Sequence, residues 1–126
     1  MDRQQIGLKL TLDALGVPVR LDSFADRLTV QKSVYLAQAA GVQLGYQFHW
    51  YLRGPYSPTL TRDAFGVVAE LSASTDDSQG WSLDTSSSKR ATALRALIQV
   101  TSARASAHFG VAWQSGVICA FAVNSV

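Results

Sequence analysis

The chain has 126 residues, which is the usual size of one domain and too short for two independent hydrophobic cores. Its 11 Lys and Arg residues against 9 Asp and Glu residues give a formal net charge of +2, so it lacks the concentrated basic charge of a dedicated nucleic-acid binder. The single cysteine, Cys119, excludes an internal disulfide framework and any multi-cysteine metal site, and the polar first residues lack the apolar core of a signal peptide. We therefore expect a cytoplasmic protein.

Leucines at positions 8, 12 and 15 recur at intervals of four and three, which predicts a helix from Asp2 to Leu15. Gly16 follows as a C-terminal cap, and a proline two residues later reinforces the stop. Asp22 or Ser23 can cap a second helical stretch.

Thr29 can cap a further helix, and the boundary between this helix and the preceding stretch stays open. The spacing of Lys32, Tyr35, Leu36 and Ala39 is typical of one helix face, so we expect this helix to run to Ala40 and to stop at the next glycine.

Apolar and polar positions alternate between residues 47 and 52, which predicts a short strand or extended edge whose buried face carries Phe48, Trp50 and Leu52. The Gly-Pro pair that follows breaks this pattern. Ser57 then has the position of an N-cap and Pro58 that of the first helical residue, where proline is well tolerated. A third helix is expected from there to about residue 71.

Residues 72–88 are mostly Ser, Thr, Asp and Gly, which predicts an exposed loop with Trp81 and Leu83 as a small anchor. Residues 85–88 can cap a fourth helix, expected from about Ser88 to Val100. After Arg104 the sequence contains no Lys, Arg, Asp or Glu. We therefore expect a mainly α, compact helical domain over residues 1–104, with one short strand or small β-hairpin, followed by an atypical apolar tail over 105–126.

No residue pattern in the chain predicts catalysis, a metal or a cofactor. His49 and His108 have no second ligand at a recognisable spacing, and Cys119 has no basic neighbour in sequence that would lower its pKa. The adjacent carboxylates of Asp76 and Asp77 lie in a Ser- and Gly-rich setting typical of a solvated loop. We expect no cofactor, no metal and no enzymatic activity.

The segment from Tyr51 to Pro58 brings Arg53, two tyrosines and the free amides of a new helix close together. Such a helix start can hold an anion or an acidic partner, whereas the structural alternative is a rigid turn that docks the third helix onto the strand. Lys32 and Tyr35 lie on neighbouring turns of one helix face, and the lysine stem is expected to cover apolar surface while its ammonium stays in water.

Two segments, Gln31–Gln38 and Phe48–Pro58, resemble the Panacea domain of SocA-like antitoxins and the related YwgA-like bacterial proteins. The resemblance implies a compact helical domain that recognises a partner protein, such as a toxin or phage-defence effector, and it implies no enzyme. Tyr56 and Ser57 depart from the more apolar residue often found after Gly-Pro in Panacea domains, which favours the YwgA-like branch. The matching signature residues are Lys32, Tyr35, Gln38, Gly54, Pro55 and Pro58.

Three functions compete at this point. The first is a protein-interaction module that presents the Gly54–Pro58 turn to a partner. The second is a winged-helix-like nucleic-acid binder, with phosphate contacts from Arg27, Lys32, Arg53 and Arg62. The third is an enzyme in which Arg53 and Tyr56 stabilise an anionic substrate. The residues predicted to bind a partner or to shape the domain are Lys32, Tyr35, Gln38, Arg53, Gly54, Pro55, Tyr56, Ser57 and Pro58.

Overall fold

A computed structural model describes the backbone of residues 1–74 and 76–109 and the side chains through Ile98, residue 75 excepted. Within this part of the chain, helices predominate and a two-stranded antiparallel hairpin is the one sheet, so the expected fold class is confirmed. The elements are α1 (Arg3–Leu15), α2 (Phe24–Ala39), β1 (His49–Tyr51), β2 (Gly54–Tyr56), α3 (Pro58–Ser72) and α4 (Thr85–Phe109).

The ends of α1 agree with the sequence pattern. Asp2 is the N-cap, and it forms a capping box in which its carboxylate accepts from the Gln5 amide at 2.8 Å while the Gln5 side chain accepts from the Asp2 amide. Gly16 ends the helix in the left-handed region at φ 70°, where a residue without Cβ is favoured.

A single helix, α2, replaces the two stretches that the capping residues left open. Ser23 is its N-cap, and the Ser23 hydroxyl accepts from the Asp26 amide at 3.1 Å. Thr29 lies inside the helix, where its hydroxyl donates to the Ala25 carbonyl at 2.8 Å, so the prediction of a second cap there is wrong. A threonine can satisfy its hydroxyl on the preceding turn, and the helix therefore continues through it.

Both later helices begin with a capping side chain. Ser57 caps α3, with Pro58 at the first helical position as predicted. At α4 the cap is Asp84, whose carboxylate accepts from the Ser87 amide at 3.1 Å, rather than one of the residues 85–88. This helix runs past the expected end at Val100 to Phe109. Most of the predicted tail, residues 110–126, lies outside the described residues, so the division after residue 104 stays a prediction.

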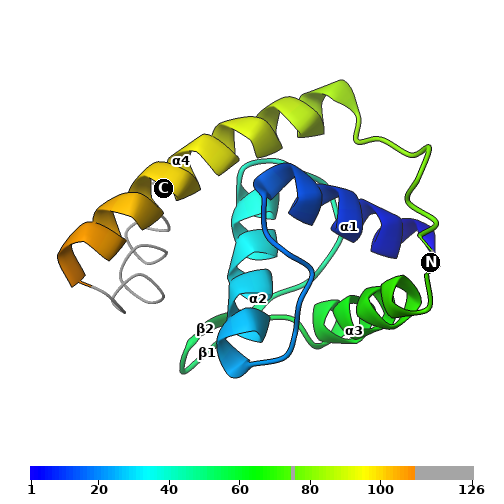
Figure 1. Cartoon of the computed structure of the whole chain (residues 1–126), viewed down its shortest axis with the longest axis horizontal. Coiled ribbons are helices and arrows are strands. Elements are labelled where there is room, and N and C mark those ends of the chain that lie inside the picture. The colour runs from blue at the N-terminus through cyan, green and yellow to red at the C-terminus, as the bar shows by residue number, and fades with distance from the viewer. Residues whose placement is uncertain (75, 110–126) are drawn as a thin grey trace.

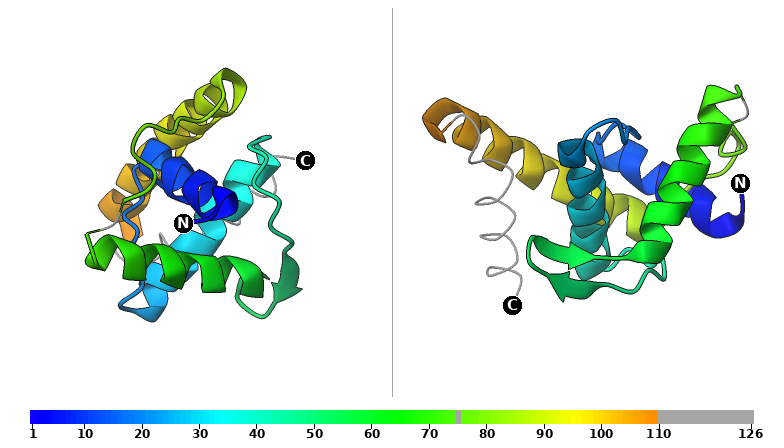
Figure 2. Two further views of the ribbon diagram at one scale, coloured as in Figure 1. Left: turned by 90° about the vertical axis from the view of Figure 1, so that its right-hand side faces the viewer. Right: turned by 90° about the horizontal axis from the view of Figure 1, so that it is seen from below.

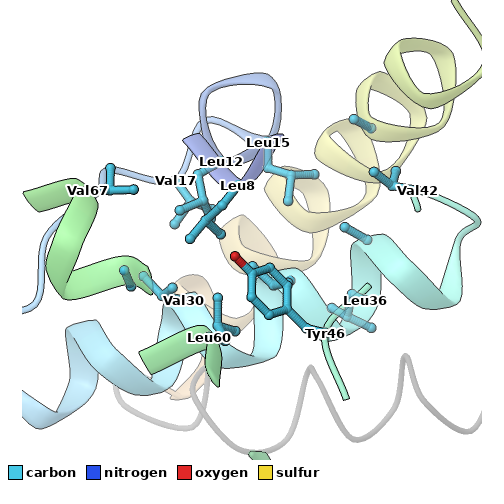
Figure 3. Close-up of a cluster of buried hydrophobic side chains, with 14 of the residues drawn as sticks. Leu8, Leu12, Leu15, Val17, Val30, Leu36, Val42, Tyr46, Leu60 and Val67 are labelled. Carbon is cyan, nitrogen blue, oxygen red and sulfur yellow. The ribbon is translucent and has the colours of Figure 1, made fainter. Parts of the chain in front are cut away.

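The hydrophobic core surrounds α1, which packs against the other three helices (Figures 1 and 2). Figure 3 shows leucines of α1 meeting Val30 of α2 and Leu60 and Val67 of α3. Gly66 of α3 lies beside the end of the Gln5 side chain of α1, since a Cβ at this position would lie 2.7 Å from Gln5 Nε2. None of the helices in the described range is long and apolar enough to cross a membrane.

Two arginines of α4 lie at the C-terminal ends of α1 and α2. The guanidinium of Arg95 packs against Gly16, and Arg90 Nη1 donates to the Ala40 carbonyl at 3.4 Å. The carbonyl end of a helix carries partial negative charge, so a cation is stabilising there. These contacts fix α4 across the ends of both helices, in addition to the burial of Ala91 and Leu94.

The buried face predicted for the strand is wrong at two of its three positions. Trp50 is 68% exposed, and Leu52 is fully exposed at the tip of the hairpin. The alternation of residues 47–52 is that of a hairpin arm that projects from the domain, so only Phe48, at its base, packs against the core cluster. The apolar side chains beyond it keep more than half of their surface exposed.

Tyr46 precedes the hairpin and is buried in the core, where its ring lies near Leu60 (Figure 3). Its hydroxyl donates to Asp63 Oδ2 at 2.9 Å, and Asp63 is also buried. Asp63 thereby ties α3 to the residue that leads into the hairpin. Burial, with the Asp63 carboxylate, raises the pKa of Tyr46 far above its usual range, so the hydroxyl stays protonated and remains a donor.

We predict that Tyr46→Phe lowers the free energy of unfolding by about 1–3 kcal/mol, because the Asp63 carboxylate loses a buried donor. Urea denaturation followed by circular dichroism measures this change. Tyr51→Phe is the matched control, since Tyr51 is more than half exposed. A Tyr46→Phe variant as stable as the control would contradict this account of the core.

Candidate partner-binding groove

Two glutamines of α2 hold the segment between α2 and α3 by its backbone. Gln38 Nε2 donates to the Tyr46 carbonyl and Gln38 Oε1 accepts from the Tyr46 amide, both at 2.9 Å. Gln31 repeats this pattern on Ser57, donating to its carbonyl at 3.0 Å and accepting from its amide at 2.9 Å. Each side-chain amide therefore pairs with one residue as a neighbouring strand would, and satisfies backbone groups that would otherwise be buried unpaired.

The spacing of these two contacts explains why the segment folds into a hairpin. Gln31 and Gln38 are seven residues apart, which places them about 10 Å apart along a helix. Tyr46 and Ser57 are eleven residues apart, and an extended chain of that length spans about 35 Å. The chain must double back, and its turn falls midway between the two anchors, with Tyr51 paired to Gly54 across it.

Other residues of α2 support the base of the hairpin. Tyr35 makes edge-to-face contacts with Phe48 and Trp50, with ring centroids 5.5 and 5.9 Å apart. Lys32 is only 5% exposed, and a Cβ at Gly54 would lie 3.6 Å from its Cε. The expectation that the Lys32 ammonium stays in water is therefore wrong, because the hairpin covers this side chain.

The Gly-Pro turn gives the second strand its shape. Gly54 has φ 112°, a backbone conformation that side chains with a Cβ rarely adopt. Pro55 is buried opposite Trp50, and Ser57, also buried, is the N-cap of α3. These positions thus build a rigid frame, which consists of the hairpin held on α2 and leading into α3. This agrees with the interpretation of the segment as a rigid turn.

An open groove of about 710 Å³ lies where the hairpin tip faces the start of α2 and the first turns of α3. Several of its apolar side chains are exposed, with values of 54% for Phe24, 57% for Tyr51 and 47% for Phe65, and Leu52 stands at its edge. In Figure 1 the hairpin lies beside the N-terminal end of α2 and leads directly into α3. The lining residues are Phe24, Arg27, Leu28, Gln31, Tyr51, Leu52, Arg53, Gly54, Pro55, Tyr56, Thr61 and Phe65.

Hydrogen bonds link this groove to the frame. Gln31 Nε2 also donates to the Thr61 hydroxyl at 2.7 Å, and that hydroxyl donates to the Tyr56 hydroxyl at 3.1 Å. Tyr56 in turn meets Tyr51 edge to face, with ring centroids 5.6 Å apart. One wall of the groove is therefore fixed to α2 and α3 before any partner arrives.

The charged residues of the groove are both arginines. Arg53 Cζ lies 5.3 Å from the centre of the Phe24 ring, a cation–π contact across the groove. Arg27 Nη1 donates to the Leu21 carbonyl at 3.1 Å. Among the described residues no Asp or Glu contributes to the lining, so this surface is apolar with a positive edge.

The remaining candidates for chemistry do not converge on this groove. His49 is exposed on β1. Asp76 accepts from the Ser78 hydroxyl at 2.5 Å and from its amide at 3.0 Å, and these bonds lower the pKa of Asp76, while Asp77 accepts from the Met1 ammonium at 2.6 Å. Within residues 1–74 and 76–98 no group of three His, Cys, Asp or Glu side chains could hold a metal ion. Cys119 and the side chain of His108 lie outside the described residues.

The predicted signature residues lie around one hairpin, but they do not all have the same role. Lys32 supports the hairpin without lining the groove, Gly54 and Pro55 shape the turn and also line the groove, and Arg53 and Tyr56 line it as well. The residues proposed to face phosphate divide likewise, since Arg62 is exposed on α3 while Lys32 is buried.

Sequence reasoning missed the groove residues contributed by α2 and α3. Phe24 and Leu28 lie one helical turn apart, as do Thr61 and Phe65, and this spacing on two neighbouring helices was the available signal. Gln31, whose pairing with Ser57 became clear only in three dimensions, was also missed.

Comparisons with protein-family models, with curated proteins and with solved structures find no significant match to this chain. The resemblance to Panacea and YwgA-like proteins therefore stays a prediction carried by the two quoted segments.

We predict that Gln38→Met and Gln31→Met each lower the free energy of unfolding by about 1–3 kcal/mol, since each leaves backbone groups of Tyr46 or Ser57 unpaired. Urea denaturation measures the loss, and increased quenching of tryptophan fluorescence by acrylamide reports a loosened hairpin. Gln43→Met is the matched control, because Gln43 is exposed. If all three variants matched the wild type, the glutamine contacts would not hold the hairpin.

Proposed function

We propose that this chain is a non-enzymatic interaction module that binds a partner protein through the groove between the hairpin tip, α2 and α3. The observation that carries the proposal is the gathering of large exposed apolar side chains around one concavity. Single exposed hydrophobic residues are ordinary on a protein surface, whereas a contiguous apolar concavity is typical of a binding site.

Large apolar side chains of the groove are left uncovered by the rest of the domain. Leu52 is wholly exposed at the hairpin tip, and Phe24, Tyr51 and Phe65 are each about half exposed. Burying such side chains on a partner is favourable, and aromatic residues in partly formed pockets are typical interface anchors. Because Gln31 and Tyr56 already fix one wall of the groove, little ordering of that wall would oppose binding.

The resemblance to Panacea domains supports a narrower form of the proposal, in which the partner is a toxin or phage-defence effector in the cytoplasm. The two similar segments are those that build the frame of the groove: one supplies Gln31 and Gln38, and the other supplies the hairpin. We propose this class of partner on the resemblance and the binding mode on the groove.

Nucleic-acid binding is the competing function, and the arginines at the groove are the residues it would use. A phosphate backbone is held by many cations along one surface, whereas this groove offers Arg27 and Arg53 on a mainly apolar lining. Apolar contact therefore fits the groove better than phosphate contact.

We predict that the tagged full chain, purified from its native host at low salt after nuclease treatment, retains a stoichiometric protein partner. Leu52→Ser and Phe65→Ser should each reduce the recovered partner at least tenfold, because they remove apolar anchors of the groove. Trp81→Ser is the matched control, since Trp81 is 54% exposed and lies outside the groove. Circular dichroism and urea denaturation confirm that each variant folds.

Equal loss of the partner from the Trp81→Ser variant, or retention by both groove variants, would contradict binding through the groove. Recovery of nucleic acid alone from untreated material, with no protein partner after nuclease treatment, would favour the nucleic-acid function instead.

A further inference from the structure

We infer that the groove recognises an acidic amphipathic segment of the partner, in which a large apolar side chain enters between α2 and α3 and nearby carboxylates pair with Arg53 and Arg27. This inference rests on the proposed function and names the chemistry of the partner. Its basis is the charge and the lining of the groove.

The apolar part of the groove is contributed by both helices. Phe24 and Leu28 of α2 and Phe65 of α3 line it, and Tyr51 of the hairpin adds an aromatic ring. An aliphatic or aromatic side chain of a partner segment would be covered by these residues and would lose its water-exposed surface. This region therefore selects an apolar anchor.

Arg53 is held over that apolar region without a carboxylate partner among the described residues. Its Cζ lies 5.3 Å from the centre of the Phe24 ring, a cation–π contact that holds the cation beside the apolar lining. The planar edge suits a carboxylate, which arginine can bind through two parallel hydrogen bonds. The cation–π contact thus places a carboxylate-binding group beside the apolar anchor site.

Arg27 adds a second cation to the groove. Its side chain is held in place by the hydrogen bond from Nη1 to the Leu21 carbonyl. Two carboxylates on the same helices are engaged elsewhere: Asp26 pairs with Arg20 at 3.5 Å, and Asp63 is buried against Tyr46. The positive charge of the groove is therefore not neutralised by acids of the lining, and a partner carrying carboxylates would complement it.

Single-stranded nucleic acid is the other ligand class that combines negative charge with flat apolar groups, since its bases stack on aromatic residues. The groove favours a peptide, because aliphatic Leu28 and Leu52 and the ring of Pro55 share the lining with the aromatic residues. An oligonucleotide is accordingly an outcome that the test below can return.

The test selects a library of random 12-residue displayed peptides on the immobilised full chain, and then titrates the enriched peptides with a fluorescent label. We expect enriched peptides to carry Leu, Phe or Trp with Asp or Glu within four residues. Arg53→Gln should weaken their binding at least fivefold, and Phe65→Ser at least tenfold. Lys89→Gln is the charge control, because Lys89 is exposed on α4, and it should stay within twofold.

Enriched peptides that need Phe65 but lack acidic residues, or that bind the Arg53→Gln variant as well as the wild type, would overturn the inference and leave the proposed function standing. Failure to enrich any peptide that depends on Phe65 would overturn both. A labelled 15-residue oligothymidylate that binds more tightly than the enriched peptides, and loses affinity in Arg53→Gln, would overturn the inference in favour of single-stranded nucleic acid.

Discussion

The pairing of two glutamine side chains with the backbone on either side of the hairpin is the interaction on which the rest of the structure depends. Gln38 holds Tyr46 and Gln31 holds Ser57, so α2 fixes both ends of a segment that has no long strand partner of its own. A two-stranded hairpin of three residues per strand is only marginally stable alone in water. Because this hairpin is anchored on α2, it is held as part of the domain.

The same anchoring separates stability from function. The base of the hairpin packs against Tyr35 and leads into the cap of α3, whereas its tip extends away from the core. The exposed apolar side chains of the groove are therefore ones that the core does not need, and they stand on backbone that the core holds in place. This arrangement allows apolar residues such as Leu52 and Phe65 to be exposed without loosening the fold, and it is the physical reason for assigning them to a partner.

Local sequence signals predicted most of the helical frame. The caps at Gly16 and Ser57 were evident, and Ser23 was one of two candidates, because capping depends on neighbouring residues in sequence. The exposure of Trp50 and the burial of Lys32 could not be predicted from the sequence, since both depend on where the hairpin lies relative to α2. The groove could be predicted only in part for the same reason. Its walls come from α2, the hairpin and α3, and of these only the turn of the hairpin has a local sequence signature.

The central claim is that the glutamines of α2 hold the hairpin ends as firmly as secondary structure would. Native-state amide hydrogen exchange by NMR tests it most directly. The amides of Tyr46 and Ser57, which donate to glutamine side chains, should exchange with opening free energies close to those of amides in the middle of α2, while the amide of Leu52 at the tip should exchange far faster. Exchange of Tyr46 and Ser57 as rapid as that of Leu52 would contradict the account.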